Sequence, residues 1–321
     1  MRFGCAPLVV LVTACYGPSV NPGSPCGPNG ECPSGLECIS GLCLPSGSTP
    51  HDDAAMPDDS AVEIDGNIVL ADAAPDGALP YVPWGTPVAV PSLDAVSGHG
   101  EGDPSITANK LTVLLTSDSP DDIFECNRTA IGQAFTCFVL AINSVDDDKS
   151  PEVSADGTTL YFSSDRGGSF DIYISKKTMG VWSTPVVATD LSSATTDSDL
   201  AISPDGLTAV VEQDPGTNHF VFFTRASTAV PFGSPVTHTE LEGPIDIAAP
   251  SLTNNGDILY FHAGNTRDIY VATRKPNGQY NMPKPVTELN TSSRDAAPFV
   301  SADDKYMLFE RAGDIYETTR P

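Results

Sequence analysis

Pairs of bulky apolar residues recur along most of the chain at a nearly constant interval. The string SPEVSADGTTLYFSSDRGGSFDIYISKK, which begins at Ser150, returns as APSLTNNGDILYFHAGNTRDIYVATRK from Ala249. A shortened copy, APFVSADDKYMLFERAGDIYETTRP, ends the chain. Several short β-type runs within one such period are typical of radial or solenoid repeat proteins. The pattern therefore predicts a repeat protein, a class that includes many binding scaffolds.

A polar turn residue anchors each repeat. The anchors are Asn109, Asp156, Asp205, Asn255 and Asp303. The residues that follow them are Lys110, Gly157, Gly206, Gly256 and Asp304. Asp-Gly and Asn-Gly between apolar runs are strong hairpin signals, because both central positions need a positive φ. Lys110 departs from this pattern and makes the first repeat the weakest.

Four strands are expected in each repeat. A short apolar run precedes the anchor, a bulky apolar pair follows it, and a third run reads DIY or a variant of it. The fourth segment opens with an aromatic residue and carries a proline three residues later; the pairs are Trp84 and Pro87, Trp182 and Pro185, Phe232 and Pro235, and Tyr280 and Pro283. Proline is tolerated on edge strands, so this segment is expected to be the outermost strand.

The repeats are out of phase with the chain ends. The last anchor has no aromatic segment after it, and the first aromatic segment, at Trp84, has no anchor before it. A circular arrangement resolves both, because the N-terminal strand can close the last sheet and leave no edge exposed. The sequence thus predicts an all-β, five-bladed β-propeller over residues 81–321. The composition of residues 45–80 argues against a sixth blade.

At this point the repeat resembles that of TolB-like propellers, the WD-type repeat of bacterial periplasmic proteins. The resemblance covers residues 81–321 and is strongest in the repeats that begin at Ser150 and Ala249. It implies a propeller used for protein–protein contact. TolB itself carries an additional N-terminal α/β domain for which this chain has no room, so TolB's partners are not carried over.

The first eighty residues predict an export signal, a small module and a tether. Residues 1–14 form a short apolar run ending in Val-Thr-Ala before Cys15, which resembles a bacterial lipoprotein signal with lipidation at Cys15. The alternative is an ordinary secretory signal with an incidental cysteine. Residues 45–80 are acidic and lack Lys and Arg, which predicts a disordered linker. The expected location is the outer membrane or cell surface, with the lipid as the only membrane attachment.

Six cysteines remain once Cys5 and Cys15 are set aside. Residues 15–44 hold Cys26, Cys32, Cys38 and Cys43, which predict a knuckle with two disulfides. Of the three pairings we favour Cys26–Cys38 with Cys32–Cys43; a zinc site is the rival interpretation.

The last two cysteines, Cys126 and Cys137, fall on neighbouring strands of the first blade. Opposed Cα atoms on such strands lie within disulfide range, which predicts a bond between them. Two free buried thiols are the alternative.

The net charge of the chain is −26. Phosphate backbones would repel such a protein, which argues against nucleic-acid binding. The expected partner is an envelope protein or a peptide, basic in character, and the propeller is expected to be a monomer.

One acidic residue precedes each predicted inner strand. These residues are Glu101, Asp148, Asp197, Asp246 and Asp295. In a propeller they would converge near one mouth of the central channel and form the expected binding face. A ring of carboxylates could bind Ca²⁺ or a cationic segment. The alternative, which we favour, is that each acid caps its own loop by accepting backbone N–H bonds. No other cofactor is expected.

The sequence lacks the familiar nucleophile and metalloenzyme motifs, including G-x-S-x-G, H-E-x-x-H and the P-loop. We therefore expect a non-catalytic protein-binding scaffold at the cell envelope. A cation- or carbohydrate-binding propeller is the second interpretation. The third is a glycoside hydrolase, since five-bladed propellers resemble those of some such enzymes. Glu152 is the one acid at the second position of an inner strand, and a second carboxylate nearby would be required.

Overall fold

A computed structural model describes residues 36–39, 42–45, 82–95, 99–118, 121–214, 218–241, 246–253 and 256–321. The chain divides into two compact units, residues 1–68 and 69–321. In the first unit, β1 (Leu36–Ile39) pairs antiparallel with β2 (Leu42–Pro45), and Cys38 stands opposite Cys43 in the register. The predicted signal peptide, Cys15, the linker and the rest of the knuckle lie outside the described residues.

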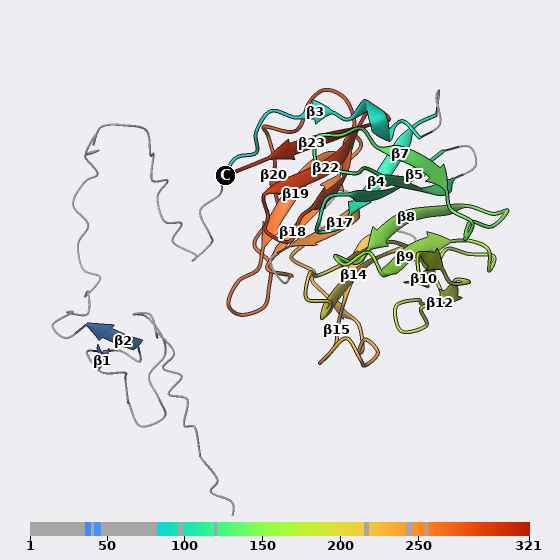
Figure 1. Cartoon of the computed structure of the whole chain (residues 1–321). Helices are drawn as coiled ribbons and strands as arrows, with labels where there is room; N and C mark the ends of the chain where they lie inside the picture. Colours follow the sequence, from blue (N-terminus) through green and yellow to red (C-terminus); the bar gives the residue numbers. More distant parts are fainter. Residues whose placement is uncertain are drawn as a thin grey trace, which may run out of the picture. The chain divides into compact units, whose positions relative to one another are not determined.

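The second unit is a five-bladed β-propeller, as predicted, and its blades follow one another in chain order (Figure 1). The first blade contains β4 (Glu101–Ile106), β5 (Thr112–Ser117), β6 (Asp122–Asn127) and β7 (Thr136–Val139). The second contains β8 (Asp148–Val153), β9 (Thr159–Ser164), β10 (Asp171–Thr178), β11 (Val181–Trp182) and β12 (Val186–Val187). The third contains β13 (Thr196–Ile202), β14 (Thr208–Asp214), β15 (His219–Thr224) and β16 (Val236–Thr237).

The fourth blade contains β17 (Ile247–Thr253), β18 (Ile258–Ala263), β19 (Asp268–Thr273) and β20 (Lys284–Pro285). The fifth contains β21 (Asp295–Val300), β22 (Tyr306–Arg311) and β23 (Asp314–Thr319), and its outer strand is β3 (Val88–Ala89) from the start of the domain. A 3₁₀ turn, η1 (Pro91–Leu93), then leads into the first blade. Within the described residues, no helix is long and apolar enough to cross a membrane.

The ring closes as the sequence predicted. β3 pairs antiparallel with β23, with Ala89 opposite Tyr316. The Gly85 N–H donates to the Thr319 carbonyl at 2.8 Å, and the Thr318 hydroxyl donates to the Gly85 carbonyl at 2.7 Å. Closure pairs the last blade with the N-terminal strand, which removes an edge on which other chains could pair.

The anchor turns differ in detail from the prediction. Only the residue after the anchor has a positive φ, for example 70° at Gly157, and Lys110 adopts it too at 59°. Asp156 keeps a negative φ, because its carboxylate caps the turn by accepting from the Ser154 hydroxyl at 2.6 Å and the Thr158 N–H at 3.0 Å. The Gly157 N–H donates to the Ser154 carbonyl at 2.8 Å, so the hairpin loop ends in one left-handed residue.

The fourth strands begin later than predicted. Trp84, Phe232 and Tyr280 precede strands β3, β16 and β20 instead of opening them. All three rings are buried between blades, with no more than 7% of each residue exposed. A ring that fills the space between blades need not belong to a paired strand. Each of these three strands starts directly after the proline of its segment, and β20 includes a second proline, Pro285.

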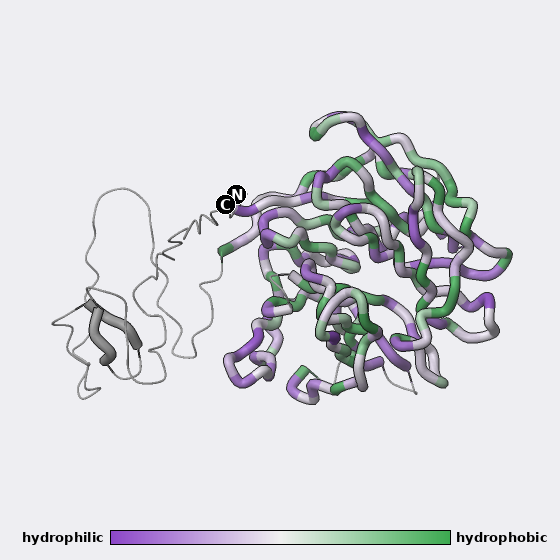
Figure 2. Tube along the Cα trace, turned by 60° about the horizontal axis from the view of Figure 1, so that its bottom comes forward, coloured by the Kyte–Doolittle hydropathy of each residue, from purple (hydrophilic) through white to green (hydrophobic). Residues whose placement is uncertain are grey.

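Cations stack on these aromatic rings at the periphery. The Arg320 guanidinium lies 4.4 Å from the Trp84 ring centre, and Arg225 lies 4.2 Å from Phe232. The Arg225 Nε–H also donates to the Gly206 carbonyl at 2.6 Å. Each cation therefore ties a turn to a buried ring. Hydrophobic and hydrophilic stretches alternate along the trace of this unit (Figure 2).

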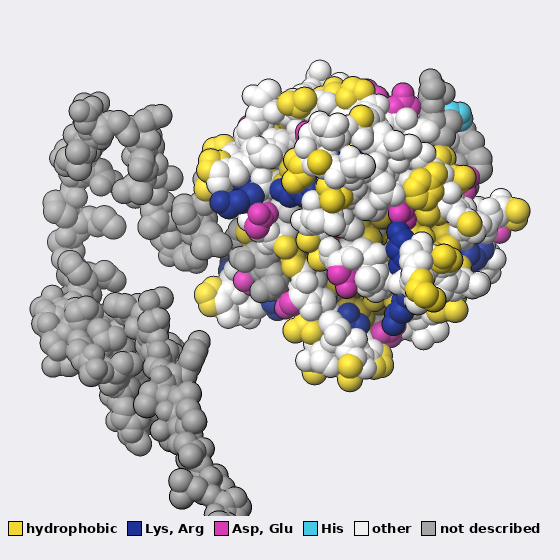
Figure 3. Space-filling model, viewed as in Figure 1, with side chains coloured by type: hydrophobic (Ala, Val, Ile, Leu, Met, Phe, Trp, Pro, Cys, Tyr) yellow, Lys and Arg dark blue, Asp and Glu magenta, His cyan; other side chains and the backbone are white. Residues whose placement is uncertain are grey.

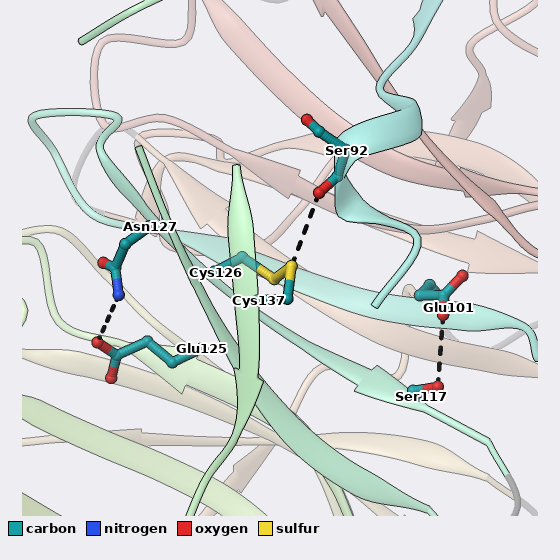
Figure 4. Close-up of a disulfide and its surroundings, with 7 residues drawn as sticks. All are labelled: Ser92, Glu101, Ser117, Glu125, Cys126, Asn127 and Cys137. Atoms are coloured by element: carbon teal, nitrogen blue, oxygen red, sulfur yellow. Dashed lines mark hydrogen bonds between the residues drawn. A yellow bond between two sulfur atoms is a disulfide. The ribbon is translucent and has the colours of Figure 1, made fainter. Parts of the chain in front are cut away.

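A disulfide joins Cys126 on β6 to Cys137 on β7, as predicted (Figure 4). The two residues are direct partners in the antiparallel register. The bond links the third and fourth strands of the first blade.

Candidate functional site

A cavity opens on the face that carries the anchor turns, which we call the turn face. Its volume is about 680 Å³. The inner strands of all five blades contribute to its lining, through Ile106, Glu152, Ile202, Leu252 and Phe299. We call this cavity the axial pocket. Its size falls in the range of about 300–1,000 Å³ that small organic ligands occupy.

Glu152 stands out in this pocket. Its Oε1 accepts the Ile202 N–H of the next blade at 3.1 Å. At the equivalent positions, the Ser105 hydroxyl accepts the Val153 N–H at 3.2 Å, and the Ser251 hydroxyl accepts the Val300 N–H at 3.0 Å. Serine is thus sufficient for the structural bond between blades. The glutamate carries a second oxygen, Oε2, that has no partner among the described residues.

Burial raises the pKa of Glu152 to about 8, and the bond from Ile202 offsets only part of this. The carboxyl is therefore uncharged at neutral pH. An uncharged carboxyl has both an O–H donor and acceptor lone pairs. Apolar side chains also line the axial pocket, among them Leu252 and Phe299.

Hydroxyl groups and rings line the walls of the axial pocket. The hydroxyl-bearing residues include Thr107, Ser154, Thr189 and Ser203, and the rings belong to Tyr161, Phe232 and Phe299. Three cations, Lys110, Lys176 and Arg225, and three further acids, Asp156, Asp190 and Asp205, also border it. On the face shown in Figure 3, acidic and basic side chains are interspersed.

The predicted acidic ring lies at the opposite end of the inner strands from the axial pocket. Asp148, Asp197 and Asp295 are fully buried, and Glu101 is 3% exposed. Each bonds within its own blade. Asp197 accepts the Ser193 N–H at 2.6 Å, and Asp295 accepts the Thr291 N–H at 2.6 Å.

Asp148 and Glu101 are held locally too. Asp148 pairs with Arg166 and accepts from the Ser144 hydroxyl at 2.9 Å. Figure 4 shows Glu101 against the Ser117 hydroxyl, 3.4 Å away. Asp246 is exposed, and its carbonyl accepts the Gly264 N–H. Among the residues described, no group of three or more His, Cys, Asp and Glu side chains could hold a metal ion. We therefore place the candidate site in the axial pocket and not at the acidic end.

A second group of acids, which the sequence analysis missed, lies between the two ends. Asp103 and Asp199 line a smaller axial cavity of about 30 Å³ together with Glu152. Each occupies a β-bulge of its inner strand, where the register shifts. A proline follows the bulge residue in four of the five blades, at Pro104, Pro151, Pro250 and Pro298. That repeated proline within an otherwise regular strand was the available signal.

Comparison with known proteins supports the fold. No family model matches the chain, and no curated protein matches it. Among solved structures, a thermostable family-43 glycoside hydrolase is similar with a TM-score of 0.51 and 15% identity, over 71% of this chain and 91% of that one. A putative TolB from Agrobacterium tumefaciens has a TM-score of 0.48 and 14% identity, over 70% of this chain and 76% of that one. At such identities the likeness concerns the fold alone.

These comparisons correct one expectation. The sequence analysis concluded that the chain is not an enzyme, and that conclusion is wrong. A glycoside hydrolase shares the propeller fold over nine-tenths of its own length, so the fold gives no ground for excluding catalysis. The motif search failed as a criterion, because glycosidase carboxylates can come from separate strands without any local motif.

Proposed function

We propose that the protein binds a neutral, hydroxyl-rich ligand, a short carbohydrate, in the axial pocket. One observation carries this proposal: Glu152 lines the pocket and does the structural work of a serine with one oxygen, which leaves its second oxygen outside that bond. A carbohydrate hydroxyl both donates and accepts, which matches an uncharged carboxyl. The rings of Tyr161 and Phe299 offer apolar surface for sugar faces.

The pocket favours a small ligand over a folded partner. A protein-binding face of standard size buries about 800 Å² on each side and needs no deep cavity. Here the feature with the most distinctive chemistry lies inside a pocket of about 680 Å³. We include in the proposal the export and lipid attachment at Cys15 that the sequence predicts, which would place the pocket at the cell envelope.

Glycoside hydrolysis is the second candidate, favoured by the protonated state of Glu152. A general acid must hold its proton at the working pH, and a carboxyl with a pKa of about 8 does so at neutral pH. Asp103 and Asp199 line the smaller cavity beside it and could supply the second carboxylate. Sugar release from polysaccharide that is lost in Glu152→Gln would support this candidate.

Calorimetric titration of the whole chain with xylotriose and maltotriose tests binding. Three variants sharpen the test. Glu152→Gln keeps the shape and a donor, and we expect it to bind within a few-fold of wild type. Glu152→Leu removes all polar atoms and should weaken binding about tenfold or more. Ser251→Ala loses the same kind of bond between blades outside the pocket lining, so it controls for stability and should bind normally.

Absence of heat with both neutral trisaccharides would refute the carbohydrate proposal. Equal affinity of wild type and Glu152→Leu would show that Glu152 has no part in binding. Weakened binding in Ser251→Ala as well would assign the effect to the loss of a bond between blades.

A further inference from the structure

Side chains from three consecutive blades meet at the propeller axis. The bulge residues Asp103 on β4, Ser150 on β8 and Asp199 on β13 all have positive φ, at 48°, 53° and 26°. The Ser150 hydroxyl lies 3.2 Å from Asp103 Oδ2 and also hydrogen-bonds Asp199 Oδ1. Glu212, on β14, hydrogen-bonds Asp199 from within the third blade, and the Ala249 N–H lies within reach of both carboxyls, 3.2 Å from Asp199 Oδ2 and 3.4 Å from Glu212 Oε2. This arrangement borders the proposed carbohydrate site, because Asp103 and Asp199 line the same smaller cavity as Glu152.

The count of hydrogens in this chain of contacts is informative. A serine hydroxyl has one hydrogen to donate. Ser150 therefore cannot donate to both aspartates, and if it donates to Asp199 it must accept from a protonated Asp103. Asp199 and Glu212 are both carboxyls, so their hydrogen bond also requires a proton on one of them. The contacts thus need one proton at each of two places.

Asp199 is the group that stays ionised. It accepts from Ser150, from Glu212 and from the Ala249 N–H at 3.2 Å. Burial opposes its charge, but the hydrogen bonds from Glu212 and Ser150 outweigh burial and lower its pKa. The pKa of Asp103 is raised to about 7 and that of Glu212 to about 10. Burial is the larger cause in both cases, and the negative charge of Asp199 is the second. The protons are therefore held by Asp103 and Glu212.

Other charged groups face the cluster from the surrounding strands. Lys149 on β8 attracts all three acids, and its ammonium lies 4.2 Å from the Phe170 ring centre. Glu310 on β22 repels Asp103 and is itself paired with Arg294 at 2.8 Å. His262 on β18 accepts the Ala297 N–H, and burial lowers its pKa to about 4, so it is neutral above that pH. Lys149 alone therefore could not balance the charges of Asp103, Asp199 and Glu212 if all three were ionised.

We propose that Asp103, Ser150, Asp199 and Glu212 form a proton-holding latch at the propeller axis, which joins the first three blades at neutral pH and loosens when alkaline pH removes its protons. The folded protein holds protons that the unfolded chain releases above about pH 4. Stability that depends on these protons is therefore present at low pH and is lost as pH rises through the folded-state values.

Thermal unfolding of the whole chain between pH 5 and pH 10 tests the latch. The comparison is made in a Glu152→Gln background, so that the acid of the axial pocket does not contribute. We expect the melting temperature to fall by about 5 °C or more between pH 6 and pH 9. Adding Glu212→Gln should flatten this fall, because an amide keeps a permanent donor toward Asp199. Asp156→Asn, at an exposed turn, is the matched control and should leave the fall unchanged.

A second measurement does not depend on any latch variant folding. Carboxyl ¹³C resonances of the Glu152→Gln protein, with all latch residues intact, should show two acids that titrate above pH 6. An unchanged alkaline fall in Glu212→Gln would overturn the proposal. So would carboxyl resonances that all titrate below pH 5.

Discussion

Removal of the Trp84 side chain should open the ring at its closure. Trp84 is 4% exposed and packs edge-on against Tyr260, with ring centres 6.1 Å apart. The guanidinium of Arg320, in the segment after β23, lies 4.4 Å from the centre of the Trp84 ring. Replacing a buried tryptophan by alanine costs about 3–5 kcal/mol. The loss of the cation–π contact adds about 0.5–1 kcal/mol.

Trp182 provides a matched control, since it holds the equivalent position in the second blade. It is half-buried, and its indole N–H donates to Glu125 at 2.8 Å. We expect Trp182→Ala to cost about 1–2 kcal/mol, with no effect on closure. Trp84→Phe should be mild, because the Trp84 indole N–H has no partner among the described residues.

Urea unfolding measures the free energies, and amide hydrogen exchange locates the damage. In Trp84→Ala, protection should fall in β23, which pairs with β3, while β13 and β14 keep theirs. In Trp182→Ala, β23 should remain protected. The reasoning is refuted if Trp84→Ala is no less stable than Trp182→Ala, or if exchange rises equally in all blades.

Three further predictions follow from the described contacts. Replacing Cys126 and Cys137 by alanine should lower the unfolding free energy by about 2–4 kcal/mol in urea titration, and an unchanged value would show that the bond is dispensable. Trisaccharide affinity should be constant from pH 5 to 7 and should decline above pH 8 as Glu152 ionises, whereas Glu152→Gln should give a flat calorimetric profile. Asp295→Ala should cost about 3–5 kcal/mol, since it leaves Arg311 without its buried partner; a cost below about 1 kcal/mol would contradict this interpretation.

The architecture could be read from the sequence because its signals are local. A turn such as Ala155-Asp156-Gly157 fixes a hairpin through its own backbone and its own capping side chain. The recurrence of that turn at a nearly constant interval predicts the number of blades. The last repeat lacks an outer strand and the first outer strand lacks a repeat before it, which predicts that the two close one blade. Cys126 and Cys137 could be paired for the same reason, since both belong to one hairpin.

The axial acids could not be found in this way, because they meet across blades. Asp103, Ser150 and Asp199 are nearly one repeat apart in sequence, and their contact depends on bulges that turn each strand toward the axis. The five predicted acids lie at or beside the starts of the inner strands. Asp197 and Asp295 accept hydrogen bonds from the N–H groups of Ser193 and Thr291 in the preceding loops, which a repeat pattern alone does not reveal. Glu152 was identified as unusual from the sequence, but its neutral state depends on burial.

A crystal structure of the whole chain grown with xylotriose would test the central claim most directly. The account predicts sugar density in the axial pocket on the turn face, with a sugar oxygen in hydrogen-bonding distance of Glu152 Oε2. Sugar bound at the opposite mouth, beside Asp148 and Asp295, or an axial pocket without sugar at saturating concentration, would contradict it.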